Sequence, residues 1–297
     1  MMLKRMFKHK SVKVFAIVTF LAFMVMSQHA CVDSLDSNDG SENPINTFLL
    51  GLSANPNTQF GNASEESFIQ VDTLLVPDGS PISYEITFSS GLPPSLRGCL
   101  FGGSATVENN SAFVNYLSGV LIGVGEIATV NISATVDILE GPSESDFITV
   151  TLEGIGITPP DDQDIEVPNP GDTEAADIFL TLIFNTTGVT PGTIAEVSLS
   201  NPGIGLFDGT SDVVLVPVQG SVDAGEFVVQ YNAFRAGGTQ VITARIQLEV
   251  PPDLAAVCPV PDPEDLLIEA VVVITQSVAP PPDEEEEDGE GDGGDGG

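Results

Sequence analysis

The side chains of this protein that could take part in chemistry are 43 Asp and Glu carboxylates and three cysteines, Cys31, Cys99 and Cys258. Both histidines and all lysines lie before residue 31, so the rest of the chain has no imidazole base and no amine nucleophile. Nucleophile–histidine arrangements, Schiff bases and histidine-based zinc sites therefore cannot be built there. Paired carboxylates could still act as in glycosidases, but there is no Trp and only three Tyr to line a sugar-stacking cleft. We therefore expect the protein not to be an enzyme.

Acidity dominates the chain after residue 30. Only Arg97, Arg235 and Arg245 oppose 43 acidic residues there, which leaves a formal charge of −40. Such a chain repels nucleic acid and anionic membrane surfaces, and it attracts cations and basic partners. The last residues, "DEEEEDGEGDGGDGG", combine charge repulsion with glycine entropy. We predict a disordered acidic C-terminal tail over residues 278–297 and no nucleic-acid partner.

The N-terminus has the pattern of an export signal. An apolar run from Val14 to Met26 contains Thr19 as its only polar residue and falls short of the ~20 residues that a membrane-spanning helix needs. This pattern predicts a signal peptide over residues 1–30. The basic residues that precede the run are Lys4, Arg5, Lys8, Lys10 and Lys13.

The end of this segment resembles a bacterial lipoprotein signal, in which a peptidase cuts before a cysteine that then carries the lipid. Ala30 fits the small residue before the cut, whereas Gln28 and His29 depart from the usual Leu and small residue. The resemblance implies that Cys31 is acylated and is followed by an acidic tether over residues 31–44. The alternatives are ordinary cleavage, for which Gln28 is too large, and an uncleaved membrane anchor.

All three interpretations of the N-terminus export the body of the protein. We expect it at the bacterial cell envelope, as an outer-membrane lipoprotein or at the cell surface, and otherwise in a secreted or periplasmic form.

Between signal and tail, the sequence has the pattern of an all-β protein. Residues 45–277 alternate apolar and polar side chains, with Gly, Pro and Asn at intervals of about 8–12 residues. Segments such as "ISYEITFS", "ATVNISATVDI" and "QVITARIQLEV" read as strands, and we find no helical stripe. The length exceeds the ~100 residues of one ordinary sandwich, so we expect two domains.

An internal repeat supports two domains. Asn55-Pro56 recurs as Asn169-Pro170, "CLFGGS" recurs as "GLFDGT", "AFVNYLSG" as "EFVVQYNAF" and "VNISATVDI" as "QVITARIQL". We place the domains at residues 45–158 and 173–277. The Pro/Asp-rich segment 159–172 is predicted to be an extended, semi-rigid linker between them.

Both copies resemble bacterial Ig-like domains of the invasin/intimin type. The resemblance implies two tandem immunoglobulin-like β-sandwiches, and an adhesive or spacing role. Aromatic residues in both copies are then expected to fill the cores, and Gly79 and Gly188 to supply turn dihedrals. The motifs are Asp78-Gly79-x-Pro81, Val130-x-Ile132-x-Ala134 and Gly237-Gly238-Thr239-x-Val241-Ile242-Thr243-Ala244, and the expected core aromatics are Phe88, Phe113, Tyr116, Phe184, Phe227 and Tyr231.

The same resemblance bears on the two remaining cysteines. Cys99 follows the third strand of the first copy, and Cys258 precedes the last strand of the second copy. In a head-to-tail pair of Ig-like sandwiches these two loops face one junction, and an exported location permits a disulfide. The alternative is two unpaired, half-buried thiols.

Acidic residues gather in the predicted linker. Asp161, Asp162, Asp164 and Glu166 would lie where the sandwiches meet, and the later "PDPED" loop is expected to approach the same pole. Calcium prefers six to eight oxygen ligands and tolerates irregular geometry, so a calcium site there is one hypothesis. The alternative is that these acids are simply solvated. We expect no other cofactor.

Together these patterns predict an exported, lipid-anchored cell-envelope protein with a structural, adhesive or ligand-binding role. Its partner would be a protein or a glycan, and it would meet the membrane through a lipid anchor. The alternative is an accessory spacer subunit of a larger envelope complex.

Overall fold

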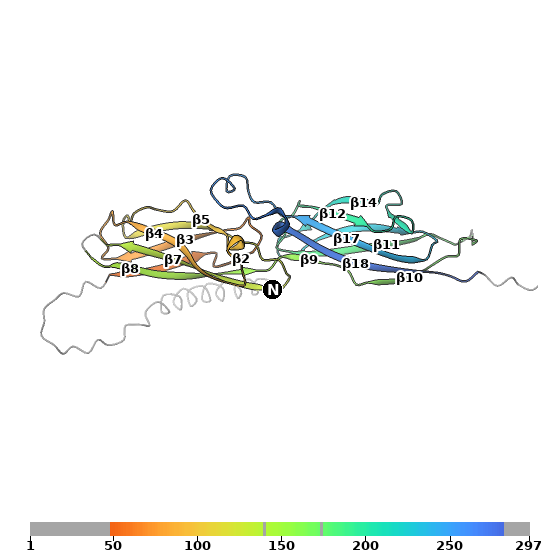
Figure 1. Cartoon of the computed structure of the whole chain (residues 1–297), viewed down its shortest axis with the longest axis horizontal. Helices are drawn as coiled ribbons and strands as arrows, with labels where there is room; N and C mark the ends of the chain where they lie inside the picture. Colours follow the sequence, from red (N-terminus) through yellow and green to blue (C-terminus); the bar gives the residue numbers. More distant parts are fainter. Residues whose placement is uncertain (1–47, 139–140, 173–174, 282–297) are drawn as a thin grey trace, which may run out of the picture. The chain divides into compact units, whose positions relative to one another are not determined.

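The computed structural model describes residues 48–138, 141–172 and 175–281, which belong to one compact unit, Thr47–Gly297. This part of the chain consists of β-strands and two short 3-10 turns, Pro94–Leu96 and Pro263–Leu266 (Figure 1). The all-β fold expected from the sequence is confirmed. Within the described ranges, no helix is long and apolar enough to cross a membrane. The predicted signal peptide, the predicted tether, Cys31 and residues 282–297 of the predicted tail lie outside the described residues. Val278, where the tail was predicted to begin, is instead the last residue of the final strand.

The first sandwich consists of two four-stranded sheets. One sheet has the order β1-β3-β6-β5, and the other has the order β2-β8-β7-β4. Neighbouring strands are antiparallel except β2 and β8, which are parallel. The bounds are β1 Leu49–Asn55, β2 Thr58–Phe60, β3 Glu66–Leu74, β4 Ile82–Ser90, β5 Cys99–Phe101, β6 Ser111–Leu117, β7 Ile127–Asp137 and β8 Ser143–Glu153.

The second sandwich repeats this plan with two five-stranded arrangements. Its sheets have the orders β13-β16-β11-β9, with β15 also paired to β16, and β10-β18-β17-β12-β14. The first sheet of each sandwich has the A-B-E-D order of an immunoglobulin domain, and the second contains its G-F-C order. The bounds are β9 Gly156–Thr158, β10 Gln163–Val167, β11 Ile178–Thr187, β12 Ile194–Leu199, β13 Gly205–Phe207, β14 Val213–Pro217, β15 Gln219–Gly220, β16 Gly225–Ala233, β17 Gly238–Gln247 and β18 Leu267–Val278.

The structure differs from the predicted domain boundaries, because the segment expected to be a linker belongs to the second sandwich. β9 pairs with β11, and β10 runs parallel to β18 with Gln163 opposite Ile274. Ile165 and Val167 turn inward while Asp164 and Glu166 stay exposed, so this acidic segment is a half-buried edge strand. Only Gly154 and Ile155 separate β8 from β9. The two sandwiches therefore follow each other with almost no linker.

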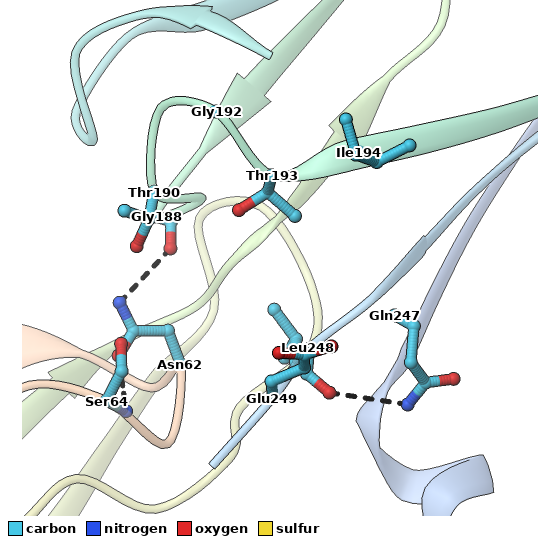
Figure 2. Close-up of a pocket in the computed structure, with 10 residues that line it drawn as sticks. All are labelled: Asn62, Ser64, Gly188, Thr190, Gly192, Thr193, Ile194, Gln247, Leu248 and Glu249. Atoms are coloured by element: carbon cyan, nitrogen blue, oxygen red, sulfur yellow. Dashed lines mark hydrogen bonds between the residues drawn. The ribbon is translucent and has the colours of Figure 1, made fainter. Parts of the chain in front are cut away.

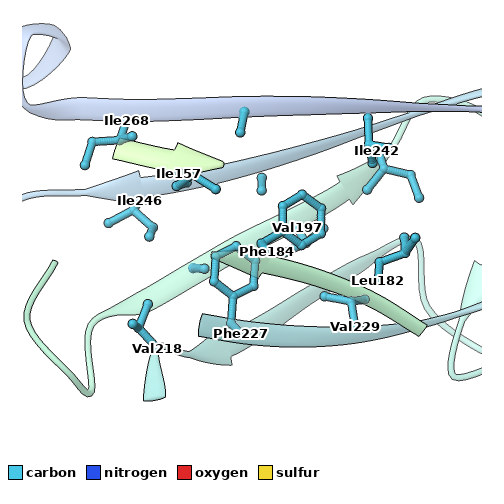
Figure 3. Packing of buried hydrophobic residues seen from close by; sticks show 14 of the residues in the cluster. Ile157, Leu182, Phe184, Val197, Val218, Phe227, Val229, Ile242, Ile246 and Ile268 are labelled. Atoms are coloured by element: carbon cyan, nitrogen blue, oxygen red, sulfur yellow. The ribbon is translucent and has the colours of Figure 1, made fainter. Parts of the chain in front are cut away.

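The core of the second sandwich contains the aromatic residues expected from the sequence. Phe184 and Phe227 are buried and stacked, with ring centroids 4.9 Å apart. Figure 3 shows both rings between aliphatic side chains of the two facing sheets. Ile246 and Ile268 come from β17 and β18 and belong to the same cluster.

In the first sandwich, two of the expected core aromatics are on the surface instead. Phe88 is 55% exposed and Phe113 is 40% exposed. The pairing of β4 with β7 shifts between Ile86 and Phe88, so Phe88 lies opposite the outward-facing Asn131. Phe113 alternates with buried neighbours on β6 and stacks on Phe68 at 5.5 Å. The expectation was wrong for these two residues because a strand bulge and the strand period decide their face.

One buried tyrosine in each sandwich fastens a loop to the core. The Tyr116 hydroxyl donates to the Arg97 carbonyl oxygen at 2.7 Å, and the Tyr231 hydroxyl donates to the Ile204 carbonyl oxygen at 3.4 Å. Burial raises the pKa of Tyr231 to about 12 and raises the pKa of Tyr116 above its ordinary value. Each hydrogen bond holds the segment just before β5 or β13. The two sandwiches therefore share this tyrosine contact as well as their strand order.

Candidate functional site

The junction between the sandwiches is the place where distant parts of the chain converge. Ile155, in the two-residue connector, is fully buried and belongs to the core cluster of the second sandwich. Ala63 and Val120 of the first sandwich belong to the same cluster, and Phe60 and Leu96 pack against it. One apolar core therefore continues from the second sandwich into the end of the first, which resists hinge motion because opening would expose this surface to water.

Asn62 is the polar centre of the junction. It is 4% exposed, and its Oδ1 accepts hydrogen bonds from the Ser64 amide at 3.0 Å and the Glu65 amide at 3.1 Å. Its Nδ2 donates to the carbonyl oxygen of Gly188 in the second sandwich at 3.2 Å. Figure 2 shows the Asn62 side chain reaching toward Gly188. A single side chain thus shapes the loop between β2 and β3 and binds the neighbouring sandwich.

Gly188 fits this place because it has no side chain. Its φ of +71° lies in the left-handed region, as expected from the sequence. A Cβ atom there would lie 2.2 Å from Ile155 Cγ2 and 3.0 Å from Phe60 Cδ1. The turn after β11 therefore sits directly against the first sandwich, and glycine permits that close approach.

A disulfide between Cys99 and Cys258 joins the sandwiches covalently, with Cα atoms 5.7 Å apart. Cys99 is the first residue of β5, and Cys258 lies in the loop between β17 and β18. Both are buried, and they cluster with Leu117 of the first sandwich and Leu254 of the loop. The structure thus brings together the two cysteines that the Ig-like resemblance placed at one junction.

A groove of about 510 Å³ lies beside the Asn62–Gly188 contact. The Asn62 amide is used in the junction, and the Gln247 amide nitrogen donates to the carbonyl oxygens of Leu248 and Pro263. The groove is lined by hydroxyl and amide groups and one carboxylate. These groups suit hydrogen bonding to a polar ligand, and they include no nucleophile–base pair. Figure 2 shows the lining residues Asn62, Ser64, Gly188, Thr190, Gly192, Thr193, Ile194, Gln247, Leu248 and Glu249.

The four acids of the calcium hypothesis lie on or just before β10. Asp162 Oδ1 accepts a hydrogen bond from the Val273 amide at 2.8 Å, and Asp164 and Glu166 face solvent. In the described ranges, no group of three or more His, Cys, Asp or Glu side chains is placed to hold a metal ion. Calcium binding by Asp161, Asp162, Asp164 and Glu166 stays a prediction.

The "PDPED" loop does not approach these four acids as the sequence led us to expect. Asp262, Glu264 and Asp265 precede Leu267, the first residue of β18, whereas Asp162 lies beside Val273 on the same strand. The six residue-to-residue steps from Leu267 to Val273 separate the two groups by roughly 20 Å, at about 3.3 Å per step. The parallel pairing of β10 and β18 causes this separation.

Sequence reasoning missed Asn62. A local signal existed, because Asn followed by Ser and Glu two and three residues later is typical of an Asx turn. That signal predicts the bonds to Ser64 and Glu65 only. The bond to Gly188 joins residues 126 positions apart and follows from the packing of the two sandwiches.

Neither a protein-family model nor a curated protein matches this chain. Among solved structures, the chain is similar to the adhesin InvE of Yersinia pseudotuberculosis, with 13% identity over 76% of this chain and 58% of that chain and a TM-score of 0.27. It is similar to invasin, a bacterial integrin-binding protein, with 14% identity over 77% of this chain and 40% of that chain and a TM-score of 0.28.

The D00-D0 domain of intimin is another similar structure, with 11% identity over 76% of this chain, all of that chain and a TM-score of 0.27. The similar solved structures thus include invasin and intimin, whose type of domain the sequence motifs resemble. The chain spans less than two thirds of the InvE and invasin chains. The immunoglobulin-like fold rests on the strand order described above.

Proposed function

We propose that this protein is an exported, lipid-anchored component of the bacterial cell envelope with a structural or adhesive role. Its two sandwiches act as one spacer that holds a protein or glycan partner away from the membrane. The observation that carries this proposal is the Cys99–Cys258 disulfide between the sandwiches. Disulfides form and persist in oxidising, exported compartments, and a bridged pair of domains suits a stiff spacer.

The junction supports the spacer role in a second way. A tandem array bends where its linkers are long, whereas here Gly154 and Ile155 alone connect β8 to β9. Ile155 is buried in a shared core, and the Asn62–Gly188 hydrogen bond closes the contact beside it. Bending would cost both the apolar contacts and the hydrogen bond.

The charge of the protein supports a particular kind of partner. Of the three arginines after residue 30, Arg245 pairs with Glu269 at 2.7 Å and Arg235 lies 3.6 Å from Asp177. Acidic side chains therefore dominate the exposed charge, and a protein partner would be basic where it meets them. A neutral glycan would instead bind at the uncharged strand faces or in the groove beside Asn62.

The anchor is tested by fractionating cells that make the wild type or Cys31→Ser. We expect the wild type in the membrane fraction, labelled by a fatty-acid analogue, and Cys31→Ser unlabelled in the soluble fraction. The double variant Cys99→Ser/Cys258→Ser is the control and should keep the label. A mature wild-type protein without lipid, beginning at another residue, would contradict the lipoprotein assignment.

The adhesive role is tested by coating beads with the purified protein and measuring their binding to basic proteins and to a glycan array. Specific binding that the free protein inhibits would support adhesion. Co-purification with a stable envelope complex, without any binding by the isolated protein, would favour the alternative of an accessory spacer subunit.

A further inference from the structure

We propose that the Cys99–Cys258 bridge makes this protein a force-bearing linker, in which tension between the two ends of the chain bypasses β6 to β8 of the first sandwich and all strands of the second except β18. The proposal rests on the proposed function, since tension arises when one end is anchored and a partner is held elsewhere. It goes beyond that function, because it assigns a mechanical task to the bridge. The connectivity of the strands carries the argument.

The disulfide shortens the covalent path along the chain. Tension entering at β1 follows the backbone to Cys99, crosses the two sulfur atoms to Cys258 and leaves through β18. The sequence separation of 159 residues is thereby removed from the extensible chain. At about 3.4 Å per extended residue, the bridge withholds roughly 54 nm of contour length.

In the second sandwich, the load path contains only part of the loop before β18 and β18 itself. β18 is already extended, so it gains little length under tension. It is held by ten register pairs with β17 and by five with β10. The strands from β9 to β17 lie off the path, and the second sandwich can stay folded while the ends are pulled.

In the first sandwich, the path runs through β1, β2, β3 and β4 and ends at the start of β5. Cys99 is anchored there, because it pairs with Leu117 on β6 and packs in the apolar cluster that contains Leu254. The strands β6, β7 and β8 lie beyond Cys99 and carry no backbone tension. Unfolding under force is therefore limited to the segment before Cys99.

The bridge also protects the joint between the sandwiches. Gly154 and Ile155 lie inside the bridged segment, so the peptide connector carries no load. Ile155 itself lies inside the bridged segment, whereas Asn62 lies before Cys99 on the loaded backbone, so the bridge does not shield the Asn62–Gly188 bond. The connector of a tandem array is ordinarily in series with its domains, and here a covalent bond runs in parallel with it.

The test is single-molecule stretching of the full chain carrying Cys31→Ser, with handles joined enzymatically to both termini. Three samples are compared: oxidised protein, protein treated with a phosphine reductant, and the variant Cys99→Ser/Cys258→Ser. A nonreducing peptide map of the oxidised sample verifies the Cys99–Cys258 linkage. The reduced wild type guards against a variant that merely fails to fold.

We expect the reduced and double-variant chains to show two unfolding events, and the oxidised chain to lack the event of the second sandwich. The total contour-length gain of the oxidised chain should be smaller by roughly 54 nm. Equal gains in oxidised and reduced samples, or two full unfolding events in the oxidised sample, would overturn the proposal. This measurement needs neither lipid nor ligand. Its outcome is therefore independent of the proposed function, which the Cys31→Ser fractionation tests separately.

Discussion

The Asn62 side chain and the Gly188 carbonyl group form a hydrogen bond of 3.2 Å that crosses from one sandwich to the other. The same side chain holds the Ser64 and Glu65 amides through its oxygen atom. One residue therefore couples the conformation of a loop to the position of the next domain.

We predict that Asn62→Ala destabilises the protein by about 1–3 kcal/mol, because buried amide and carbonyl groups lose their partner. Asn62→Asp keeps the accepting oxygen and loses only the donor to Gly188, so it tests the bond between the sandwiches. Denaturant unfolding measures both variants. Asn57→Ala, at an exposed position in the same region, is the control and should change the stability by less than about 0.5 kcal/mol. An equally small effect of Asn62→Ala would contradict this role.

Gly188→Ala should destabilise the junction more than Gly192→Ala. Both glycines have positive φ, +71° and +92°, so both substitutions strain the backbone. Only at Gly188 would the new Cβ collide with Ile155, while nothing lies within 4 Å at Gly192. We expect about 1 kcal/mol of destabilisation for Gly192→Ala and a further 1–3 kcal/mol for Gly188→Ala. Equal melting temperatures of the two variants would argue against tight packing at the junction.

Phe227→Ala and Phe88→Ala should differ sharply in their effect on stability. Phe227 is 1% exposed and stacked on Phe184, so truncation should cost about 3–5 kcal/mol. Phe88 points outward beside Asn131, so its truncation should change the stability by at most about 0.5 kcal/mol. Calorimetry of the two variants measures the difference. A large loss of stability in Phe88→Ala would indicate that the Phe88 ring is packed in the core.

The three tyrosines should ionise late in the folded protein. Burial raises the pKa of Tyr84 and Tyr231 to about 12, from an ordinary value of 10.0, and raises the pKa of Tyr116 as well. The neutral form is favoured in the folded state, so this stabilisation is fully present below pH 10 and is lost as the pH rises through the folded-state pKa. Absorbance at 295 nm should show a folded-state midpoint near pH 12, against about 10 in denaturant. A folded-state midpoint at 10 would contradict the burial.

Calcium should bind only weakly at Asp161, Asp162, Asp164 and Glu166. Asp162 already accepts the Val273 amide, and residues two apart on a strand are separated by roughly 6.6 Å, too far to share a tight cage. We expect isothermal titration of the full chain to give the same diffuse binding in the wild type and in Asp161→Asn/Asp164→Asn. A saturable site that disappears in the double variant would instead establish the calcium hypothesis.

Much of the local structure was determined by the sequence alone. Apolar and polar residues alternate with the strand period, and the turn at Gly79, with φ of +85°, needs a residue without Cβ. The repeat predicted two copies of one sandwich, and in the structure β5 pairs with β6 as β13 pairs with β16, both antiparallel. These features depend on interactions between near neighbours, which the order of residues records directly.

The position of single residues within the sheets was decided by tertiary structure. A one-residue shift in the β4–β7 pairing turns Phe88 outward, and no periodicity in β4 itself reveals it. From the sequence, Asp164 and Glu166 were predicted to belong to a linker. In the structure they belong to β10, which is a strand because β18 pairs with it in parallel. In both cases the neighbouring strand, distant in sequence, settles which face a side chain takes.

The contacts between the two sandwiches depend on tertiary structure more than any other feature of the protein. The sequence contains Cys99, Cys258, Asn62 and Gly188, and it indicates turns and an exported location. A disulfide needs Cα atoms within about 7 Å, and a hydrogen bond needs donor and acceptor within about 3.5 Å. Contacts across 159 and 126 residues meet these limits only because two folded sandwiches, joined by two residues, pack against each other. Residue types establish which bonds can form, and the packing of the domains determines which ones do.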